Sequence, residues 1–310
     1  MSQPVLVIGA TLMDIKGIPL AGLEPGTSNP SQISYARGGT ARNVAENLAR
    51  LGANVMLMSA VGNDYTGRLL VAQTADAGVN TSEVQFVDGA ETGSYIAILG
   101  ADGMLSVALD DVRVLEENIT SGYLYQRRRL FRDASMVMVD GSLTHDALKM
   151  VVRLASQYKV PLVADPSSAR LASKLCPYLN QLHLVVPNEA EAVVIVGEEF
   201  AGHDQDAALE LADRLVKMGV RHAVVTMSDF GLAYATDDET GFIPASYREM
   251  VDSTGTGDAL SAAVMFGMLE GLPAIEAMRL GAAAASLTLQ TTETVVNDLS
   301  LDMLYDHLIV

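Results

Sequence analysis

The chain has 310 residues, 49% of them hydrophobic, and a formal net charge of −18. This length and composition support a folded chain with a sizeable core and exclude a predominantly disordered one. The net negative charge argues against nucleic acid or an anionic membrane as a partner, since both bind basic protein surfaces. No apolar run reaches the roughly 20 residues that a transmembrane helix needs.

A small phosphorylated ligand remains compatible with the negative charge, because a helix N-terminus, a few local cations and magnesium can together hold a phosphate. The single cysteine, Cys176, excludes an internal disulfide framework and suits a reducing compartment. The first residues, "MSQPVLVIGATLMD", lack a basic segment ahead of the apolar run. We therefore expect no signal peptide and a cytoplasmic protein.

Short apolar runs alternate with helical patterns along the chain. Most of the runs are apolar on both faces, as in a parallel sheet that is covered by helices on each side. Helical patterns occur at 41–52 and 206–219, and two Ala-rich helices between 256 and 290 are separated at 270–274. This alternation predicts a doubly wound α/β fold in one domain over residues 1–310. The expected strands are residues 4–9, 54–62, 135–141, 160–166, 182–188, 222–227 and 231–236.

Two segments, residues 15–37 and 84–110, do not fit this alternation. The first is rich in Gly, Pro and Ser, and the second has short alternating runs on either side of the turn "ADGM". We expect the two segments to form one small β-sheet set apart from the main sheet. Near the carboxyl ends of the main strands, such a sheet would act as a lid over a ligand.

Polar residues and glycines follow the first strand, where open α/β sheets bind ligands. Asp14 lies just past that strand, as either a ligand-binding residue or an ordinary turn aspartate. Gly38 and Gly39 then let the backbone approach a polar ligand, ahead of a helix that carries Arg42 and Asn43 in its first turn. An amide can both donate to and accept from a hydroxyl group, so Asn43 suits a sugar-like ligand. The alternative is an ordinary helix start with a surface arginine.

The stretch "PNEAE" places Asn188 and Glu191 three residues apart after a strand. On a helix this spacing puts both side chains on one face. Beside a phosphate, a carboxylate and an amide could hold magnesium through water. The alternative is a helix N-cap, Asn188, with an acidic residue in the first turn.

The stretch "DSTGTGD" carries the most specific signal in the chain. Residues 254–257 offer successive backbone N–H groups at a helix start, where the helix dipole also stabilises an anion. Asp258 follows in the first turn, so it could take a proton from a hydroxyl nucleophile beside that anion. The alternative is that Asp258 only stabilises the helix dipole. However, the two glycines of Gly-x-Gly lower stability through conformational entropy, and a simple helix cap does not need them.

Three stretches together, "GGTARNVA", "PNEAE" and "DSTGTGD", resemble in order and separation the signatures of the PfkB (ribokinase-like) carbohydrate kinases. The resemblance covers essentially the full chain. It implies a ribokinase-like, mostly parallel sheet flanked by helices, with a small β-sheet lid. It also implies transfer of a phosphoryl group from MgATP to a hydroxyl of a sugar or nucleoside.

The resemblance also implies roles for individual residues. Asp258 would be the catalytic base, and Gly255, Thr256 and Gly257 would form the anion hole. Thr256 replaces the alanine usual in the family, which the backbone chemistry tolerates. The residues that would bind the acceptor are Asp14, Gly38, Gly39, Arg42 and Asn43.

For the nucleotide, the resemblance implies ATP with Mg²⁺, the metal held by Glu191 through water. Asp252 and Thr254 could supply oxygens to a monovalent cation such as K⁺. The loop "TMSDFG" has Ser228 where the family often has glycine, which puts the close approach of this backbone to ATP in doubt. The residues that would line the ATP site are Asn188, Thr226, Ser228, Gly231 and Asn297.

Within the family, "SNP", "GGTARN" with its Arg42, "TGSYIAILGADG" and "ALDDV" look like the members that phosphorylate the 5′-hydroxyl of pseudouridine. Another nucleoside or a free sugar such as ribose is the alternative acceptor. A sugar phosphate would call for basic residues in the lid, and residues 84–110 contain none. A non-catalytic sugar-binding regulator is opposed by the intact Asp258 and its glycines. A dehydrogenase is opposed by the absence of Gly-x-Gly-x-x-Gly after the first strand.

The expected lid also predicts a subunit contact. Ile96, Ile98 and Leu99 would give an edge strand an apolar surface that can pair with the lid of another subunit. We therefore expect a homodimer formed through the lid.

Overall fold

Nine strands form one large sheet in the order β13-β12-β11-β10-β9-β8-β1-β4-β5. The computed structural model describes residues 3–100, 105–198, 204–227, 230–245 and 250–308. All strands of this sheet except the last two run parallel to one another. The exceptions, β12 and β13, pair antiparallel and form one edge of the sheet. The strands are β1 Val5–Ile8, β4 Val55–Gly62, β5 Asn80–Val87, β8 Met136–Asp140, β9 Leu162–Asp165, β10 Leu184–Val185, β11 His222–Thr226, β12 Gly231–Thr236 and β13 Thr240–Pro244.

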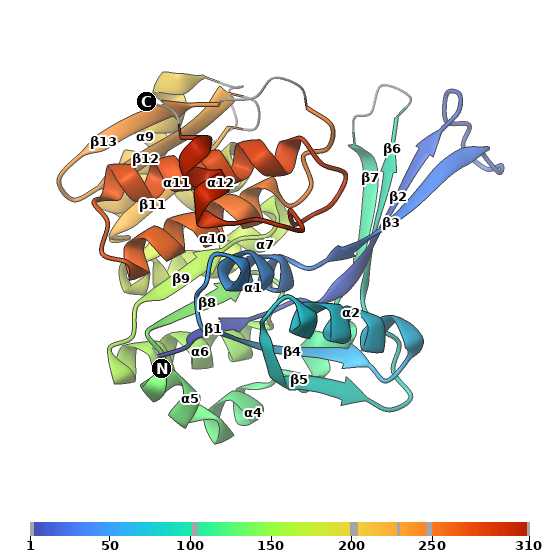
Figure 1. Ribbon diagram of the computed structural model, residues 1–310, viewed down its shortest axis with the longest axis horizontal. Helices are drawn as coiled ribbons and strands as arrows, with labels where there is room; N and C mark the ends of the chain where they lie inside the picture. Colours follow the sequence, from blue (N-terminus) through green and yellow to red (C-terminus); the bar gives the residue numbers. More distant parts are fainter. Residues whose placement is uncertain (1–2, 101–104, 199–203, 228–229, 246–249, 309–310) are drawn as a thin grey trace.

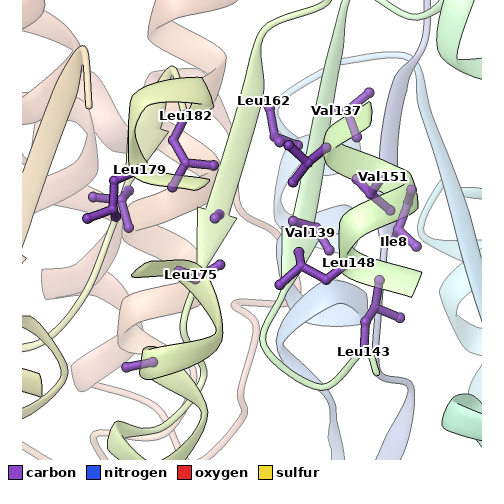
Figure 2. Packing of buried hydrophobic residues seen from close by; sticks show 14 of the residues in the cluster. Ile8, Val137, Val139, Leu143, Leu148, Val151, Leu162, Leu175, Leu179 and Leu182 are labelled. Atoms are coloured by element: carbon purple, nitrogen blue, oxygen red, sulfur yellow. The ribbon is translucent and has the colours of Figure 1, made fainter. Parts of the chain in front are cut away.

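The central strands are buried on both faces, as their apolar runs predict. In β1, Leu6 and Ile8 contribute to one hydrophobic cluster, while Val5 and Val7 contribute to another on the opposite face. Figure 2 shows the first cluster, where Ile8 of β1 lies among side chains of β8 and the helix that follows it. The doubly wound fold is therefore confirmed.

Helices cover both faces of this sheet (Figure 1). One face carries α1 Thr40–Arg50, α2 Tyr65–Asp76, α10 Thr256–Leu269, α11 Ala274–Leu289 and α12 Leu301–Asp306. The other carries α3 Arg113–Asn118, α4 Ser121–Gln126, α5 Arg128–Asp133, α6 His145–Tyr158, α7 Ala169–Ala172, the 3₁₀ helix Ser173–Gln181, α8 Glu189–Val196 and α9 Gln205–Lys217. None of the helices in the described ranges is long and apolar enough to cross a membrane.

A separate sheet of four strands, here named the lid sheet, projects from the main body (Figure 1). Its order is β3-β2-β6-β7. The strands are β2 Leu12–Pro19, β3 Ser31–Gly38, β6 Ser94–Leu99 and β7 Leu105–Asp111.

The small sheet was expected from residues 15–37 and 84–110, and two details differ. Residues 84–87 belong to β5 of the main sheet, because Val84 is buried in the core and pairs with β4. The lid sheet also begins earlier, at Leu12, so it includes Asp14. The short strand β13 was missed, because its five residues carry only a brief apolar pattern.

Candidate active site

Two cavities lie at the start of α10, and residues between 253 and 258 contribute to the lining of each. The first, here named the lid cavity, has a volume of about 310 Å³ and lies between the lid sheet and the main sheet. The second, here named the α10 cavity, has a volume of about 230 Å³. Thr254 and Asp258 line the lid cavity, while Ser253, Thr256 and Gly257 line the α10 cavity. One short backbone segment therefore contacts both spaces.

The N-terminus of α10 has no side-chain cap. Its N-cap, Gly255, adopts a left-handed conformation with φ of 80° and offers no side chain to cap the helix. A Cβ atom at this position would collide with the carbonyl oxygen of Thr294, so both conformation and space require glycine. The first N–H groups of a helix lack intrahelical acceptors, and here no side chain of the N-cap takes their place.

Asp258 lies in the first turn of α10 and lines the lid cavity. Asn43 Nδ2 donates a hydrogen bond of 2.6 Å to Asp258 Oδ2. Burial raises the pKa of Asp258 to about 7; the bond from Asn43 opposes this shift, and the charges of Asp14 and Asp140 add to it. A carboxylate with a pKa near neutrality is suited to accept a proton from a hydroxyl group.

Asp14 faces the same cavity from strand β2 of the lid sheet. It is 6% exposed, and burial raises its pKa to about 6 against the opposing charges of Arg42 and Lys16. Gly38 of the neighbouring strand lies against this side chain, and a Cβ atom there would collide with the Asp14 carboxylate. Gly39 has φ of 96°, and a Cβ there would collide with the Ala10 carbonyl oxygen. Of these two glycines, Gly39 lines the cavity and Gly38 makes room for Asp14.

Arg42 does not line the lid cavity, and this differs from its expected role in acceptor binding. Its side chain is fully buried. The guanidinium donates to the carbonyl oxygens of Gly38 at 3.1 Å and Arg37 at 2.7 Å, to Thr294 Oγ1 at 3.0 Å, and to Asn43 Oδ1. Because Asn43 in turn holds Asp258, Arg42 positions the catalytic candidate through another side chain.

Asn188 and Glu191 form a reciprocal capping box at the start of α8. Asn188 Oδ1 accepts from Glu191 N at 2.9 Å, and Glu191 Oε2 accepts from Asn188 N at 2.9 Å. Asn188 also lines the α10 cavity. Burial raises the pKa of Glu191 to about 7, the Asn188 backbone N–H opposes the shift, and the charge of Asp258 adds to it. The capping role is therefore present, and Glu191 keeps a second oxygen for another partner.

Sequence reasoning missed two further carboxylates, Asp140 and Asp165, which end strands β8 and β9. Asp165 is buried, and burial together with the charges of Asp258 and Glu191 raises its pKa well above the usual value. The signal for both was available, because each aspartate ends a strand where open α/β sheets bind ligands. Asp140 has a structural role, since its carboxylate accepts from the N–H groups of Ala10 at 2.8 Å and Ala41 at 3.2 Å.

These carboxylates fit a magnesium ion. The charge of Asp258 adds to burial in raising the pKa of Asp165 and of Glu191, and no ion pair to a basic side chain is found for these three carboxylates among the described residues. In the same part of the chain, no three Asp, Glu, His or Cys side chains gather as a direct metal site. Mg²⁺ at phosphate sites usually keeps several waters and binds one or two carboxylates together with phosphate oxygens. A cation would relieve the mutual repulsion of this group.

The Asp252 carboxylate, expected to be free for a monovalent cation, already has a cationic partner. The ammonium of Lys16, from strand β2 of the lid sheet, pairs with Asp252 Oδ2, and Thr254 N donates to Oδ1 at 2.9 Å. Burial alone would raise the pKa of Asp252, but the hydrogen bonds from Lys16 and Thr254 outweigh it, and the pKa is lowered. The pair connects the lid sheet to the segment that precedes α10.

The expected nucleotide residues do not all come together. Thr226 and Gly231 line the α10 cavity beside Asn188. Ser228 lies outside the described residues. The assignment of Asn297 to the nucleotide site is wrong. Asn297 lines a different cavity together with Arg37 and Arg50, and both arginines donate hydrogen bonds to it. The cause is that the chain after α11 crosses α1, where Arg50 holds the Asn297 carbonyl oxygen.

The buried Oγ1 of Thr256 has no hydrogen-bond partner in the part of the chain that the structure describes. We expect Thr256→Ala to keep the KM for ATP within threefold and to raise the free energy of unfolding by about 1 kcal/mol, since an unpaired buried hydroxyl is removed. Steady-state kinetics and thermal denaturation would measure both. A tenfold rise in KM would instead make the hydroxyl a nucleotide ligand. Gly257→Ala is the matched control, because it adds one methyl group to the same cavity wall.

The fold and this site define a phosphotransferase of the ribokinase-like class. The model of the "pfkB family carbohydrate kinase" matches residues 2–299, and the chain belongs to this family. A curated relative, the pseudouridine kinase of Escherichia coli, is 32% identical over 96% of this chain and 94% of its own. The guanosine-inosine kinase of Exiguobacterium acetylicum is 28% identical over 93% of this chain and 95% of its own.

Solved structures show the same fold. A ribokinase of Arabidopsis thaliana, determined with ribose and ATP, superposes with a TM-score of 0.77. It covers 98% of this chain and 99% of its own length, at 23% sequence identity. The ribokinase-like sheet with a small separate sheet is therefore confirmed, as is the assignment to the phosphotransferases.

Proposed function

We propose that the protein transfers the γ-phosphoryl group of MgATP to the 5′-hydroxyl of pseudouridine. The observation that carries this proposal is that the N-terminal segment of α10 contacts two cavities, with Asp258 lining the lid cavity and the adjacent Gly257 lining the α10 cavity. A nucleotide in the α10 cavity and an acceptor in the lid cavity would meet at residues 254–258. Phosphoryl transfer needs mainly this kind of positioning, together with stabilisation of charge.

The proposed mechanism assigns each step to a residue. Asn43 holds the Asp258 carboxylate, which takes the proton as the acceptor hydroxyl attacks. The N–H groups of Gly255, Thr256 and Gly257 stabilise the negative charge of the transferred group. When bound near Glu191, Mg²⁺ would neutralise charge on the phosphate oxygens. Asp14 accepts hydrogen bonds from the hydroxyl groups of the acceptor, and so orients it.

The lining of the lid cavity favours an uncharged acceptor. Asp14, Asp110, Asp140 and Asp258 contribute to it, and no Lys, Arg or His does so among the described residues. A sugar phosphate would meet repulsion there, whereas the hydroxyl and N–H groups of a nucleoside would find acceptors. The similarity to the pseudouridine kinase of Escherichia coli supports this nucleoside as the acceptor. The similarity to guanosine-inosine kinase and to ribokinases supports the second candidate, another nucleoside or free ribose.

The experiment is ADP release from MgATP, coupled to a spectroscopic readout, across a panel of acceptors. The panel holds pseudouridine, uridine, cytidine, adenosine, inosine, guanosine, ribose and fructose 6-phosphate. We expect turnover of pseudouridine above all others and its loss in Asp258→Asn. Turnover of a different acceptor would retain the kinase and replace the substrate. If no acceptor gives turnover that Asp258→Asn abolishes, the proposal fails.

The pH dependence follows from the raised pKa of Asp258, about 7, in which burial is the main cause. Because the base must be ionised to accept a proton, we expect kcat/KM to fall tenfold per pH unit below about pH 7 and to level off above pH 8. Because the charge of Asp258 raises the pKa of Glu191 and of Asp165, the apparent pKa belongs to these neighbouring carboxylates together. A pH–rate profile at saturating MgATP measures it. A flat profile between pH 5.5 and 8 would contradict Asp258 as the base.

The expected dimer needs a different surface from the one the sequence predicted. Strand β6, with Ile96 and Ile98, is central in the lid sheet, so it offers no free edge. The apolar surface is instead the sheet face opposite Asp14, where side chains alternate away from the lid cavity. Size-exclusion chromatography with light scattering is expected to show a dimer, and Leu109→Lys a monomer. Exposed residues on this face are Ile33, Tyr35, Val107 and Leu109.

A further inference from the structure

We propose that Asp110 distinguishes pseudouridine from uridine by accepting a hydrogen bond from the ring N1–H, a donor that uridine lacks. The inference rests on the proposed function, and it assigns the choice of nucleoside to one side chain of the lid sheet. Asp110 is the second-to-last residue of strand β7, lies outside the three motifs that define the site, and lines the lid cavity.

The chemistry of the two nucleosides sets the requirement. Pseudouridine joins its base to ribose through carbon, so both ring nitrogens carry hydrogen, whereas in uridine one nitrogen is bonded to the ribose. When the two riboses are superposed, the carbonyl groups and N3–H coincide. The remaining difference is an N–H in pseudouridine where uridine has a C–H. A site that separates them needs a hydrogen-bond acceptor at that edge of the base, and an ionised carboxylate offers only acceptors.

The register of the lid sheet places Asp110 in line with Asp14. Asp14 pairs with Tyr95 across β2 and β6, and Tyr95 pairs with Asp110 across β6 and β7. All three side chains line the lid cavity. Neighbouring strands lie about 4.8 Å apart, so roughly 10 Å separates Asp14 from Asp110 along this row. That span suits a nucleoside whose ribose hydroxyl groups contact Asp14.

Asp110 lies at the end of the cavity away from Asp258. An adjoining cavity shares Asp110, Val112 and Leu171 with the lid cavity, but neither Asp258 nor Asp14 lines it. A ribose with its 5′-hydroxyl at Asp258 therefore directs its base toward this end. The apolar side chains of Val112 and Leu171 line the same end and suit the faces of a ring.

The Asp110 carboxylate is available for a ligand. It is exposed, and no hydrogen bond or ion pair to another described residue is found for it. Its neighbour Asp111 differs, because Arg113 holds both oxygens of that carboxylate. Tyr95 stands between the two acids of the row, and burial, with the charges of Asp14 and Asp110, raises the pKa of its phenol. The phenol therefore stays protonated and can donate as well as accept, whereas the Asp110 carboxylate offers acceptors only.

The experiment compares kcat/KM for pseudouridine, uridine and N1-methylpseudouridine in the full-length protein. We expect the wild-type protein to prefer pseudouridine over both other nucleosides. Asp110→Ala should lower the ratio of pseudouridine to uridine by about 10- to 100-fold, the value of one hydrogen bond to a charged group. Asp110→Asn should lower it less, because the amide keeps one acceptor oxygen.

Asp111→Asn is the matched control, since it removes a neighbouring charge and is expected to leave the ratio unchanged. Titration calorimetry with pseudouridine and uridine in the absence of ATP gives the same comparison for binding alone. A wild-type ratio near one, or an unchanged ratio in both Asp110 variants, would overturn the inference and leave the kinase intact. Loss of turnover with every nucleoside in the wild-type protein would overturn the proposed function itself.

Discussion

Asp258→Asn is expected to lower kcat by about 10²- to 10⁴-fold, the usual contribution of a general base. The amide cannot accept the proton of the acceptor hydroxyl. Its carbonyl oxygen can still accept the hydrogen bond that Asn43 Nδ2 now gives to the carboxylate. The geometry of the site is therefore kept while the base is removed. The KM values for ATP and acceptor should change little, because neither depends on the ionisation of Asp258.

The same substitution is expected to make the protein more stable at pH 8. Burial raises the pKa of Asp258 in the folded state from 3.8 to about 7, so the ionised form is disfavoured on folding. The resulting loss of stability is largest above pH 7 and shrinks as the pH falls toward 3.8, where the unfolded chain also becomes protonated. Asparagine removes this penalty. Thermal denaturation should show a higher Tm for the variant at pH 8 and a smaller difference at pH 5.

Asp140→Asn is the matched control for the effects of Asp258→Asn on kcat and on stability. Burial raises the pKa of Asp140 as well, but its carboxylate accepts hydrogen bonds from Ala10, Ala41 and Ser142. An amide would turn an N–H group toward some of these donors, so we expect Asp140→Asn to lower the Tm. An equal fall in stability in both variants would show that Asp258 has a structural role like that of Asp140.

The parts of the site that the sequence predicted are those in which the backbone carries the function. Gly38, Gly39 and Gly255 are specified by conformation or space, and such positions leave a motif in the sequence. The strands of the main sheet were predictable for a related reason, because burial on both faces produces continuous apolar runs.

The parts that the sequence did not predict depend on contacts between distant segments. Arg42 was expected at the surface of a ligand site, and only the tertiary structure shows that it is enclosed by residues 37, 38 and 294. Lys16 and Asp252 are separated by 236 residues, and no local pattern connects them. Asn297 was assigned to the nucleotide by its place in the chain, while the path of the chain after α11 takes it to α1.

Arg42→Met is expected to cause the largest loss of stability among the substitutions considered. Arg42 Nη1 pairs with Glu46 Oε2 at 2.5 Å, and neither side chain is exposed. Removing one partner of a buried pair typically costs about 3–5 kcal/mol, because the other charge stays buried. Arg37 and Arg50 also contact Glu46, at 3.2 and 2.7 Å, so the lower end of this range is expected. For a domain of this size, a fall in Tm of about 5–10 °C follows.

The substitution should also lower kcat by about tenfold, although Arg42 contacts neither cavity. Without the guanidinium, the Asn43 amide loses the bond that fixes its orientation, and Asp258 loses a fixed donor. Arg50→Met is the control, because Arg50 contacts the same Glu46 from a more exposed position, and a cost below about 1 kcal/mol is expected. A variant with unchanged Tm and kcat but a raised KM for the acceptor would instead place Arg42 in contact with the nucleoside. The combined fall in Tm and kcat would identify it as the residue that couples the buried arginine cluster to the catalytic carboxylate.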